Sequence, residues 1–389
     1  MYNIDTVVDE IMVNTLMNLG SKYKEESKHA LSEKSYNEAY ERMVKLANIN
    51  PRKHKPLLID ALNALAELHE EQGTYDLAIA KYREIVSLAR ILLRETASLT
   101  YVTLLAHTAT KVANLHREHH NRQLAQYFYT EALEHYKILE KEENYTYIQV
   151  AILNINFSLI GLYEEENLFA NAKIYYKKSL LMCQNLIDRG LEKYNHELGK
   201  LHCDLASLYF FEADFENAKK HYHISLDLLL EFVEIDSEMY IESLAIVQNN
   251  LASIYAAQKK YDKALSFYKN ALPHLSSLAE TNPAKYGHNV AVLFKNLASI
   301  YFYDGKTEKA EFFHFKSIEI FEEFSQYNEE KYNLELASCI IDGVEYYDQH
   351  TLTLYNAENI LHQYKWDQEA EILLGRISKL RKTKVKAKV

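Results

Sequence analysis

The sequence predicts an all-helical fold, a solenoid of about eight antiparallel helix pairs. The 389 residues include only 9 glycines and 4 prolines, and this scarcity of turn-forming residues favours long helices over a many-stranded β fold. Hydrophobic residues make up 48% of the chain, which is sufficient for an extended core. A set of small and aromatic residues also recurs at nearly constant spacing, as expected of stacked repeats.

The repeat is clearest in three segments of the second half of the chain. Each segment contains a Leu-Ala pair, a tyrosine four residues after the leucine, a polar turn, an alanine, and a ring side chain four residues after that alanine. In the third copy the last ring is the imidazole of His314 instead of a tyrosine. The recurring residues are Leu205, Ala206, Tyr209, Ala218 and Tyr222, then Leu251, Ala252, Tyr255, Ala264 and Tyr268, then Leu297, Ala298, Tyr301, Ala310 and His314.

The same frame extends in both directions. The alanines of the second helices recur every 46 or 47 residues after one first interval of 39, which gives eight units. The further matches are Ala30, Tyr36 and Ala39; Leu65, Ala66, Gly73, Ala78 and Tyr82; Val112, Ala113, Ala125 and Tyr129; Leu159, Tyr163, Ala172 and Tyr176; and Val344, Ala357 and Leu361.

Simple packing explains this pattern. Alanines such as Ala252 and Ala264 allow two antiparallel helices to approach closely, and rings such as Tyr255 and Tyr268 fill the space beside that pair. Spacings of three and four residues place these side chains on one helical face. Because no unit can bury its apolar face alone, stability comes from stacking on neighbouring units.

The pattern resembles the tetratricopeptide repeat, whose basic period is about 34 residues. The longer period is similar to the extended variety found in kinesin light chains and in bacterial repeat arrays attached to signalling NTPases. Residues 278–301, LAETNPAKYGHNVAVLFKNLASIY, especially resemble the bacterial form. The resemblance covers residues 20 to about 366 and implies a right-handed superhelical solenoid.

The chain divides into an array with distinct ends. Residues 1–20 are predicted to form an N-terminal capping helix closed near Gly20, and residues 21–366 form the repeat array. Residues 367–381 are predicted to form a C-terminal capping helix, and residues 382–389 a basic, disordered tail.

Two prolines give local predictions. Pro283 follows Asn282, a residue suited to an N-cap, so a helix is predicted to begin there. Pro273 lies inside a predicted second helix, and we expect it to kink that helix or to end it early.

Composition also limits the cellular compartment in which the protein is expected and the classes of partner that it is expected to bind. The net charge of −11 argues against general affinity for nucleic acid or anionic membranes. The N-terminus lacks the basic segment of a secretory signal, and no run approaches the roughly 18 apolar residues of a membrane span. Three cysteines, Cys183, Cys203 and Cys339, suit a reducing compartment. We therefore expect a cytoplasmic protein, and the sequence does not specify its oligomeric state.

No catalytic, cofactor or metal signature is present in the sequence. We therefore expect neither enzymatic activity nor a bound cofactor or metal. The cluster of His116, His119 and His120 is more consistent with a solvated turn than with a metal site, because no cysteine lies nearby. His314 occupies a packing position of the repeat, and Cys203 is interpreted as a small buried residue.

The functional surface that the resemblance implies is the concave groove, lined by first helices. An amide can donate and accept hydrogen bonds at once, and Asn250 and Asn296 resemble the asparagines with which related arrays hold a peptide backbone. The alternative, left open, is that both bond to neighbouring helices. The predicted groove residues are Asn63, Lys111, Asn114, Asn154, Lys200, Asp204, Asn249, Asn250, Lys295 and Asn296.

The leading functional hypothesis is a scaffold or adaptor that binds a peptide or helical segment of another protein in this groove. The alternative is a regulatory, peptide-sensing array that acts on a separate partner chain, since no output domain is visible. A change of shape on ligand binding, measured by small-angle scattering, would distinguish the second from the first. An enzyme is the least favoured class.

Overall fold

The computed structural model confirms the predicted fold class. Helices account for 91% of the residues, and no strand occurs in the part of the chain that the structure describes. The described residues are 4–142, 146–233, 237–325, 329–347, 351–364 and 366–386.

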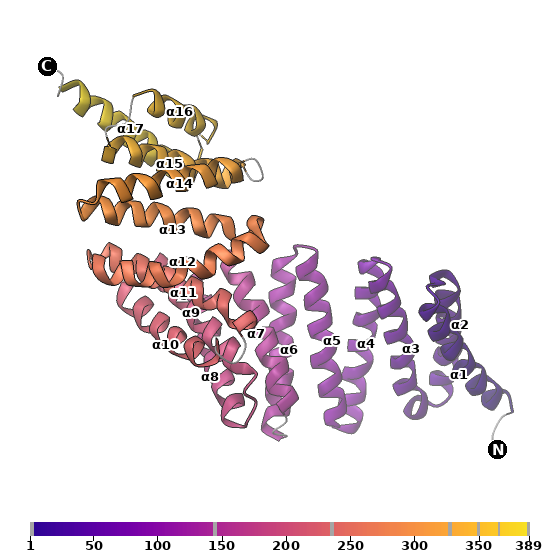
Figure 1. The fold of residues 1–389 in the computed structure, drawn as a ribbon. Coiled ribbons are helices and arrows are strands. Elements are labelled where there is room, and N and C mark those ends of the chain that lie inside the picture. Colours follow the sequence, from indigo (N-terminus) through magenta and orange to yellow (C-terminus); the bar gives the residue numbers. More distant parts are fainter. Residues whose placement is uncertain are drawn as a thin grey trace. The chain divides into compact units, whose positions relative to one another are not determined.

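The chain forms two compact units, residues 1–182 and residues 183–389, with the boundary inside helix α8 (Figure 1). The helices up to this boundary are α1 (Ile4–Glu25), α2 (His29–Ile49), α3 (Pro51–Glu71), α4 (Tyr75–Thr96), α5 (Leu99–Glu118), α6 (Arg122–Glu142), α7 (Thr146–Glu165) and α8 (Phe169–Asp188). The second unit continues with α9 (Tyr194–Phe211), α10 (Phe215–Val233), α11 (Ser237–Ala257), α12 (Tyr261–Thr281), α13 (Pro283–Tyr303), α14 (Thr307–Ser325), α15 (Glu329–Tyr347), α16 (Thr351–Leu361), the 3₁₀ turn η1 (His362–Tyr364) and α17 (Gln368–Lys386).

Helices that follow one another along the chain pack against one another. In the first unit, α1 packs with α2, α3 with α4, and α5 with α6. In the second unit, α9 packs with α10, α11 with α12, α13 with α14, and α15 with α16, while α17 contacts both α15 and α16. Figure 1 shows these pairs as successive hairpins of antiparallel helices.

Most of the residues that carry the sequence repeat are buried, which confirms the predicted register. The second-helix alanines Ala78, Ala125, Ala264 and Ala310 are fully buried, as small residues at a close helix contact should be. The rings at the last position of the repeat are buried as well, and Tyr268 is inaccessible to solvent. Large apolar side chains around these positions form the cores of the two units.

The turns between the first and second helices share one backbone conformation. The central residue of each turn has a positive φ, and the next residue donates its N–H to the carbonyl five residues earlier, as in a Schellman motif. In the fifth unit, Ala213 has φ of 59° and Asp214 N lies 2.8 Å from Tyr209 O. The seven central residues are Ser27, Gly73, His120, Asn167, Ala213, Lys259 and Gly305.

This conformation gives a first stability prediction. A left-handed residue with a Cβ costs roughly 1–2 kcal/mol, and glycine removes that cost. We expect Ala213→Gly to stabilise the protein by about 1 kcal/mol and Gly305→Ala to destabilise it by a similar amount. Chemical denaturation followed by circular dichroism measures both, and a stabilising Gly305→Ala would contradict the turn geometry.

The N-terminal end differs from the prediction. Gly20 does not close the first helix, because α1 continues to Glu25 and forms the first half of the first helix pair. Gly20 instead lies against the buried ring of Tyr36, where a Cβ would overlap that ring. Ala30 is exposed in α2 and is not a packing position. The prediction that the first helix ends near Gly20 is wrong, because Gly20 allows a close contact between helices and does not end one.

Three other helix boundaries bear on the predictions. The structure confirms Pro283 as the first residue of α13, with the Asn282 side chain accepting a hydrogen bond from Lys285 N at 3.1 Å. Pro273 does not end α12 early, since the helix continues to Thr281. The last helix, α17, extends to Lys386, beyond the predicted boundary at residue 381, and residues 387–389 of the predicted tail lie outside the described residues.

Helix α7 corrects the expectation that no segment approaches a membrane span. By length and composition alone, Thr146–Glu165 is apolar enough to cross a membrane, with a mean hydropathy of 1.3. Half of this segment is buried inside the protein, where residues such as Ile152 and Leu159 join the core of the first unit. A buried core helix meets the same criterion of length and apolar composition.

Candidate functional site

A cavity of about 660 Å³ lies in the first unit between helices α3, α5 and α7. Each of these first helices presents residues spaced by three and four, which lie on one helical face. Tyr136 of α6 also lines the cavity. The lining residues are Pro56, Ile59 and Asp60 of α3; Thr100, Tyr101, Thr103, Leu104 and His107 of α5; and Tyr147, Val150, Ala151 and Asn154 of α7.

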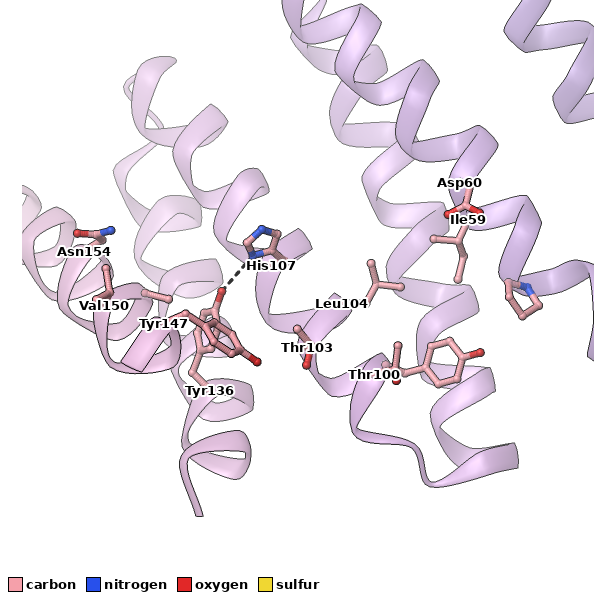
Figure 2. Close-up of a pocket in the computed structure, with 13 residues that line it drawn as sticks. Ile59, Asp60, Thr100, Thr103, Leu104, His107, Tyr136, Tyr147, Val150 and Asn154 are labelled. Atoms are coloured by element: carbon pink, nitrogen blue, oxygen red, sulfur yellow. Dashed lines mark hydrogen bonds between the residues drawn. The ribbon is translucent and has the colours of Figure 1, made fainter. Parts of the chain in front are cut away.

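Figure 2 shows the arrangement of this α3–α5–α7 cavity. The segment of α5 that carries Thr103 and Leu104 lies between Ile59 of α3 and Val150 of α7. The wall is mostly apolar, as is usual for sites that bind ligands or peptide side chains. Its volume lies within the range of about 300–1,000 Å³ typical of such sites.

Polar groups occur at only a few points of the cavity. The His107 Nδ1 atom lies 3.2 Å from the hydroxyl of Tyr136, which is otherwise buried (Figure 2). Burial raises the pKa of Tyr136. Asp60 is exposed, but neighbouring groups partly shield its carboxyl from water, and this partial desolvation raises its pKa. The cavity therefore combines an apolar surface with one carboxylate in a partly desolvated position.

The groove residues predicted in the first unit continue the same helical faces toward the C-terminal ends of the first helices. Lys111 Nζ lies 2.7 Å from Glu67 Oε1 and 3.2 Å from the Tyr82 hydroxyl, and Asn63 donates to Glu67. Asn114 accepts a hydrogen bond from the Tyr129 hydroxyl at 2.6 Å.

These side chains thus satisfy one another across neighbouring helices. Among the groove residues predicted for the first unit, Asn154 lines the cavity itself and is exposed. The accessible cavity lies at the N-terminal halves of the first helices, whereas Asn63, Lys111 and Asn114 lie in their C-terminal halves.

In the second unit, the two asparagines of the Asn-Leu-Ala motif contact buried tyrosines of the preceding repeat. Burial raises the pKa of Tyr268 to about 12, and hydrogen bonds from Ser253 and Asn296 act in the opposite direction. The Ser253 and Tyr268 hydroxyls are 2.9 Å apart. Tyr222 has the same environment, with Ser207 at 2.8 Å and Asn250 beside its hydroxyl. The geometry supports the alternative in which both asparagines bond to neighbouring helices.

The remaining predicted residues of the second unit have varied surroundings. Lys295 Nζ lies 3.1 Å from Glu335 Oε2 and 2.9 Å from Ser338 Oγ, so it pairs within the protein. Lys200 is exposed, and Asp204 is half-buried. The buried Oδ1 atom of Asn249 has no hydrogen-bond partner among the described residues.

Of the histidines singled out in the sequence, His116 and His314 are buried, whereas His119 and His120 are exposed at the turn after α5, as predicted. His314 is buried at the tyrosine position of its repeat, and burial lowers its pKa to about 4. The His116 ring stacks on Phe128 with centroids 5.5 Å apart, and the His119 ring lies 4.0 Å from that of Tyr75. Within the described part of the chain, no group of three or more His, Cys, Asp or Glu side chains is placed to hold a metal ion.

The three cysteines are buried and unbridged. Burial raises the pKa of the Cys183 and Cys339 thiols to about 12, so both are protonated and unreactive at neutral pH. Burial raises the pKa of Cys203 still further. The prediction that Cys203 is a small buried residue is confirmed.

Residues 243–323, which span most of α11 to α14, match the family model of the tetratricopeptide repeat. Over this segment the chain is similar to tetratricopeptide repeats. This matches the resemblance inferred from the anchors of repeats five to seven, and the same helix-pair architecture continues through the rest of both units. The kinesin-light-chain-like subtype stays a prediction. No curated protein matches the sequence significantly.

Several solved structures are similar to this chain at low sequence identity. BtubC (BKLC) from P. vanneervenii is 22% identical, over 62% of this chain and 89% of that chain, with a TM-score of 0.43. Aspartyl phosphate phosphatase F from Bacillus subtilis is 14% identical, over 95% and 94% of the two chains, with a TM-score of 0.49.

A signal transduction ATPase with a tetratricopeptide repeat sensor from Pyrococcus horikoshii is 13% identical, over 98% of this chain and 50% of that chain, with a TM-score of 0.46. These similarities do not specify a ligand.

The sequence did not indicate the α3–α5–α7 cavity, although a partial signal exists. The groove was placed by counting from the Leu-Ala pair, which lies in the second half of each first helix. Tyr147, Val150 and Ala151 are apolar or aromatic residues at helical spacing at the start of α7, followed by the polar Asn154, and Leu104 holds a comparable place in α5. This signal varies from repeat to repeat and therefore does not appear as a motif.

Proposed function

We propose that this tetratricopeptide repeat protein is a non-enzymatic interaction module that binds a peptide or helical segment of another protein. The α3–α5–α7 cavity is the observation that carries the proposal. It is lined almost entirely by first helices of three consecutive repeats, so a bound segment would contact several repeats at once. The three buried thiols suit work in a reducing compartment, and we place the module in the cytoplasm.

Energetic reasoning supports the same surface. Burying apolar area contributes roughly 25 cal/mol per Å², so a partly hydrated apolar cavity is a favourable place for an apolar side chain of a partner. The C-terminal halves of the same helices are polar and internally paired, as the ion pair between Lys111 and Glu67 shows. Side chains with satisfied hydrogen bonds gain little from a new partner. The binding energy should therefore come from the cavity.

A variant that fills the cavity tests the proposal. Val150 is half-buried on the cavity wall and is not part of the core clusters, so Val150→Trp should block the cavity without unfolding the protein. The wild type is expected to capture its partner proteins from a lysate of the native cell. We expect the Val150→Trp variant to capture at least tenfold less of each of them. Quantitative mass spectrometry of the captured proteins measures this loss.

The matched control introduces the same ring elsewhere. Ile138 is 46% exposed on α6, a second helix, so Ile138→Trp adds tryptophan outside the cavity. We expect it to capture the same proteins as the wild type, with the melting temperatures of both variants measured in parallel. Equal capture by the wild type and a folded Val150→Trp variant would place the interface on another surface.

A further inference from the structure

The α3–α5–α7 cavity contains a carboxylate that has no cationic partner. No ion pair or hydrogen bond of the Asp60 side chain occurs among the described residues, and desolvation alone accounts for its raised pKa. The two lysines nearest to it in sequence point to other groups, since Lys53 pairs with Glu10 and Lys55 lies 3.1 Å from Glu95 Oε1. Asp60 is an exposed residue whose carboxyl is only partly desolvated and has no cationic partner among the described residues, so it is open to a cation that enters the cavity.

The other walls of the cavity suit the partner that Asp60 lacks. Tyr101, Tyr136 and Tyr147 line the same cavity and supply aromatic groups, which attract cations through the ring faces. Leu104 and Val150 supply apolar surface suited to a hydrocarbon stem. Lysine and arginine side chains combine these two properties, since an apolar stem carries a cation at its end.

We propose that the α3–α5–α7 cavity selects a basic side chain, lysine or arginine, next to an apolar residue in the bound peptide. The cation pairs with Asp60, and the stem and the neighbouring apolar residue occupy the surface formed by Leu104 and Val150. The volume of about 660 Å³ leaves room for both residues. The net charge of −11 adds a long-range attraction for a cationic segment. This inference rests on the proposed function and specifies its ligand.

Selection from a random peptide library tests the preference. The full-length wild-type protein is immobilised and exposed to displayed heptapeptides, and the enriched sequences are compared with those from Asp60→Asn. We expect the wild type to enrich lysine or arginine adjacent to a large apolar residue, and Asp60→Asn to lose that enrichment. Enrichment of acidic or uncharged peptides by the wild type, or the absence of enrichment over the Val150→Trp variant, would overturn the inference.

The selected peptide then provides a quantitative test. Its synthetic, labelled form should bind Asp60→Asn at least tenfold more weakly than the wild type in fluorescence anisotropy, because a charge-assisted hydrogen bond is lost. Glu134→Gln, at an exposed carboxylate on α6, is the matched control and should leave the affinity unchanged. Equal affinity of Asp60→Asn and the wild type rejects the inference.

The two proposals fail in different ways. If Val150→Trp abolishes binding of the selected peptide but Asp60→Asn leaves its affinity unchanged, the proposed charge selection is wrong. The proposed binding module would still stand. Unchanged capture by Val150→Trp in the lysate experiment would reject the cavity as the interface altogether.

Discussion

Gly287→Ala is expected to destabilise the protein by about 2 kcal/mol, although alanine is normally the better helix former. Gly287 lies inside α13, where the ring of Phe324 from α14 packs directly against its backbone. A Cβ at this position would overlap the end of that ring. Phe324 is itself buried and in contact with Tyr332, at a centroid distance of 5.7 Å, so it cannot move aside without disturbing the core.

A second glycine in the same unit provides the control. Gly375 lies inside α17, and apart from its own helix backbone no atom of the described residues lies within 4 Å of the place where its Cβ would be. Gly375→Ala should therefore stabilise the protein by roughly 0.5–1 kcal/mol, since only helix propensity changes. Thermal melting by circular dichroism compares the two variants. A Gly287→Ala variant that melts as high as Gly375→Ala would contradict the close approach of α13 and α14.

A rescue experiment separates overpacking from other causes. Replacing Phe324 by leucine in the Gly287→Ala background removes the ring that the new Cβ would overlap. The double variant should be less destabilised than the sum of the two single changes, because the two residues are in contact. Simple additivity would indicate that Gly287 is required for another reason.

These glycines show why the sequence predicted the architecture better than the details. Alanines such as Ala264 recur in one frame because every helix pair needs a small residue at its crossing, and this requirement repeats along the chain. Gly20 and Gly287 allow a close contact in a single pair each, so they leave no periodic signal. In a single sequence, a glycine inside a helix cannot be distinguished from a glycine that ends one.

The site was harder to predict than the fold for a related reason. The repeat frame identifies which helices come first in each pair, and three of these do line the cavity. The lining residues, however, differ from repeat to repeat, since Asp60, Leu104 and Val150 share no residue type. Only the three-dimensional structure shows that they converge, and that the Asp60 carboxylate is left without a partner among the described residues.

The same reasoning decides between the two interpretations of Asn250 and Asn296. Both asparagines contact the hydroxyl of a buried tyrosine from the preceding repeat, together with a serine. Replacing both with alanine should therefore lower the stability by about 2–4 kcal/mol, because each change leaves a buried hydroxyl with fewer partners. Asn154→Ala is the control, since Asn154 is exposed, and it should leave the melting temperature unchanged.

A double-mutant cycle tests the contact itself. Asn296→Ala and Tyr268→Phe should each cost about 1–2 kcal/mol, and the double variant should cost about 1 kcal/mol less than their sum, because both changes remove the same hydrogen bond. Chemical denaturation of the four proteins gives the coupling free energy. The affinity for the selected basic peptide should be equal in all four, since these residues lie in the second unit and the cavity in the first. Zero coupling with unchanged stability and weakened peptide binding would instead assign Asn296 to the ligand.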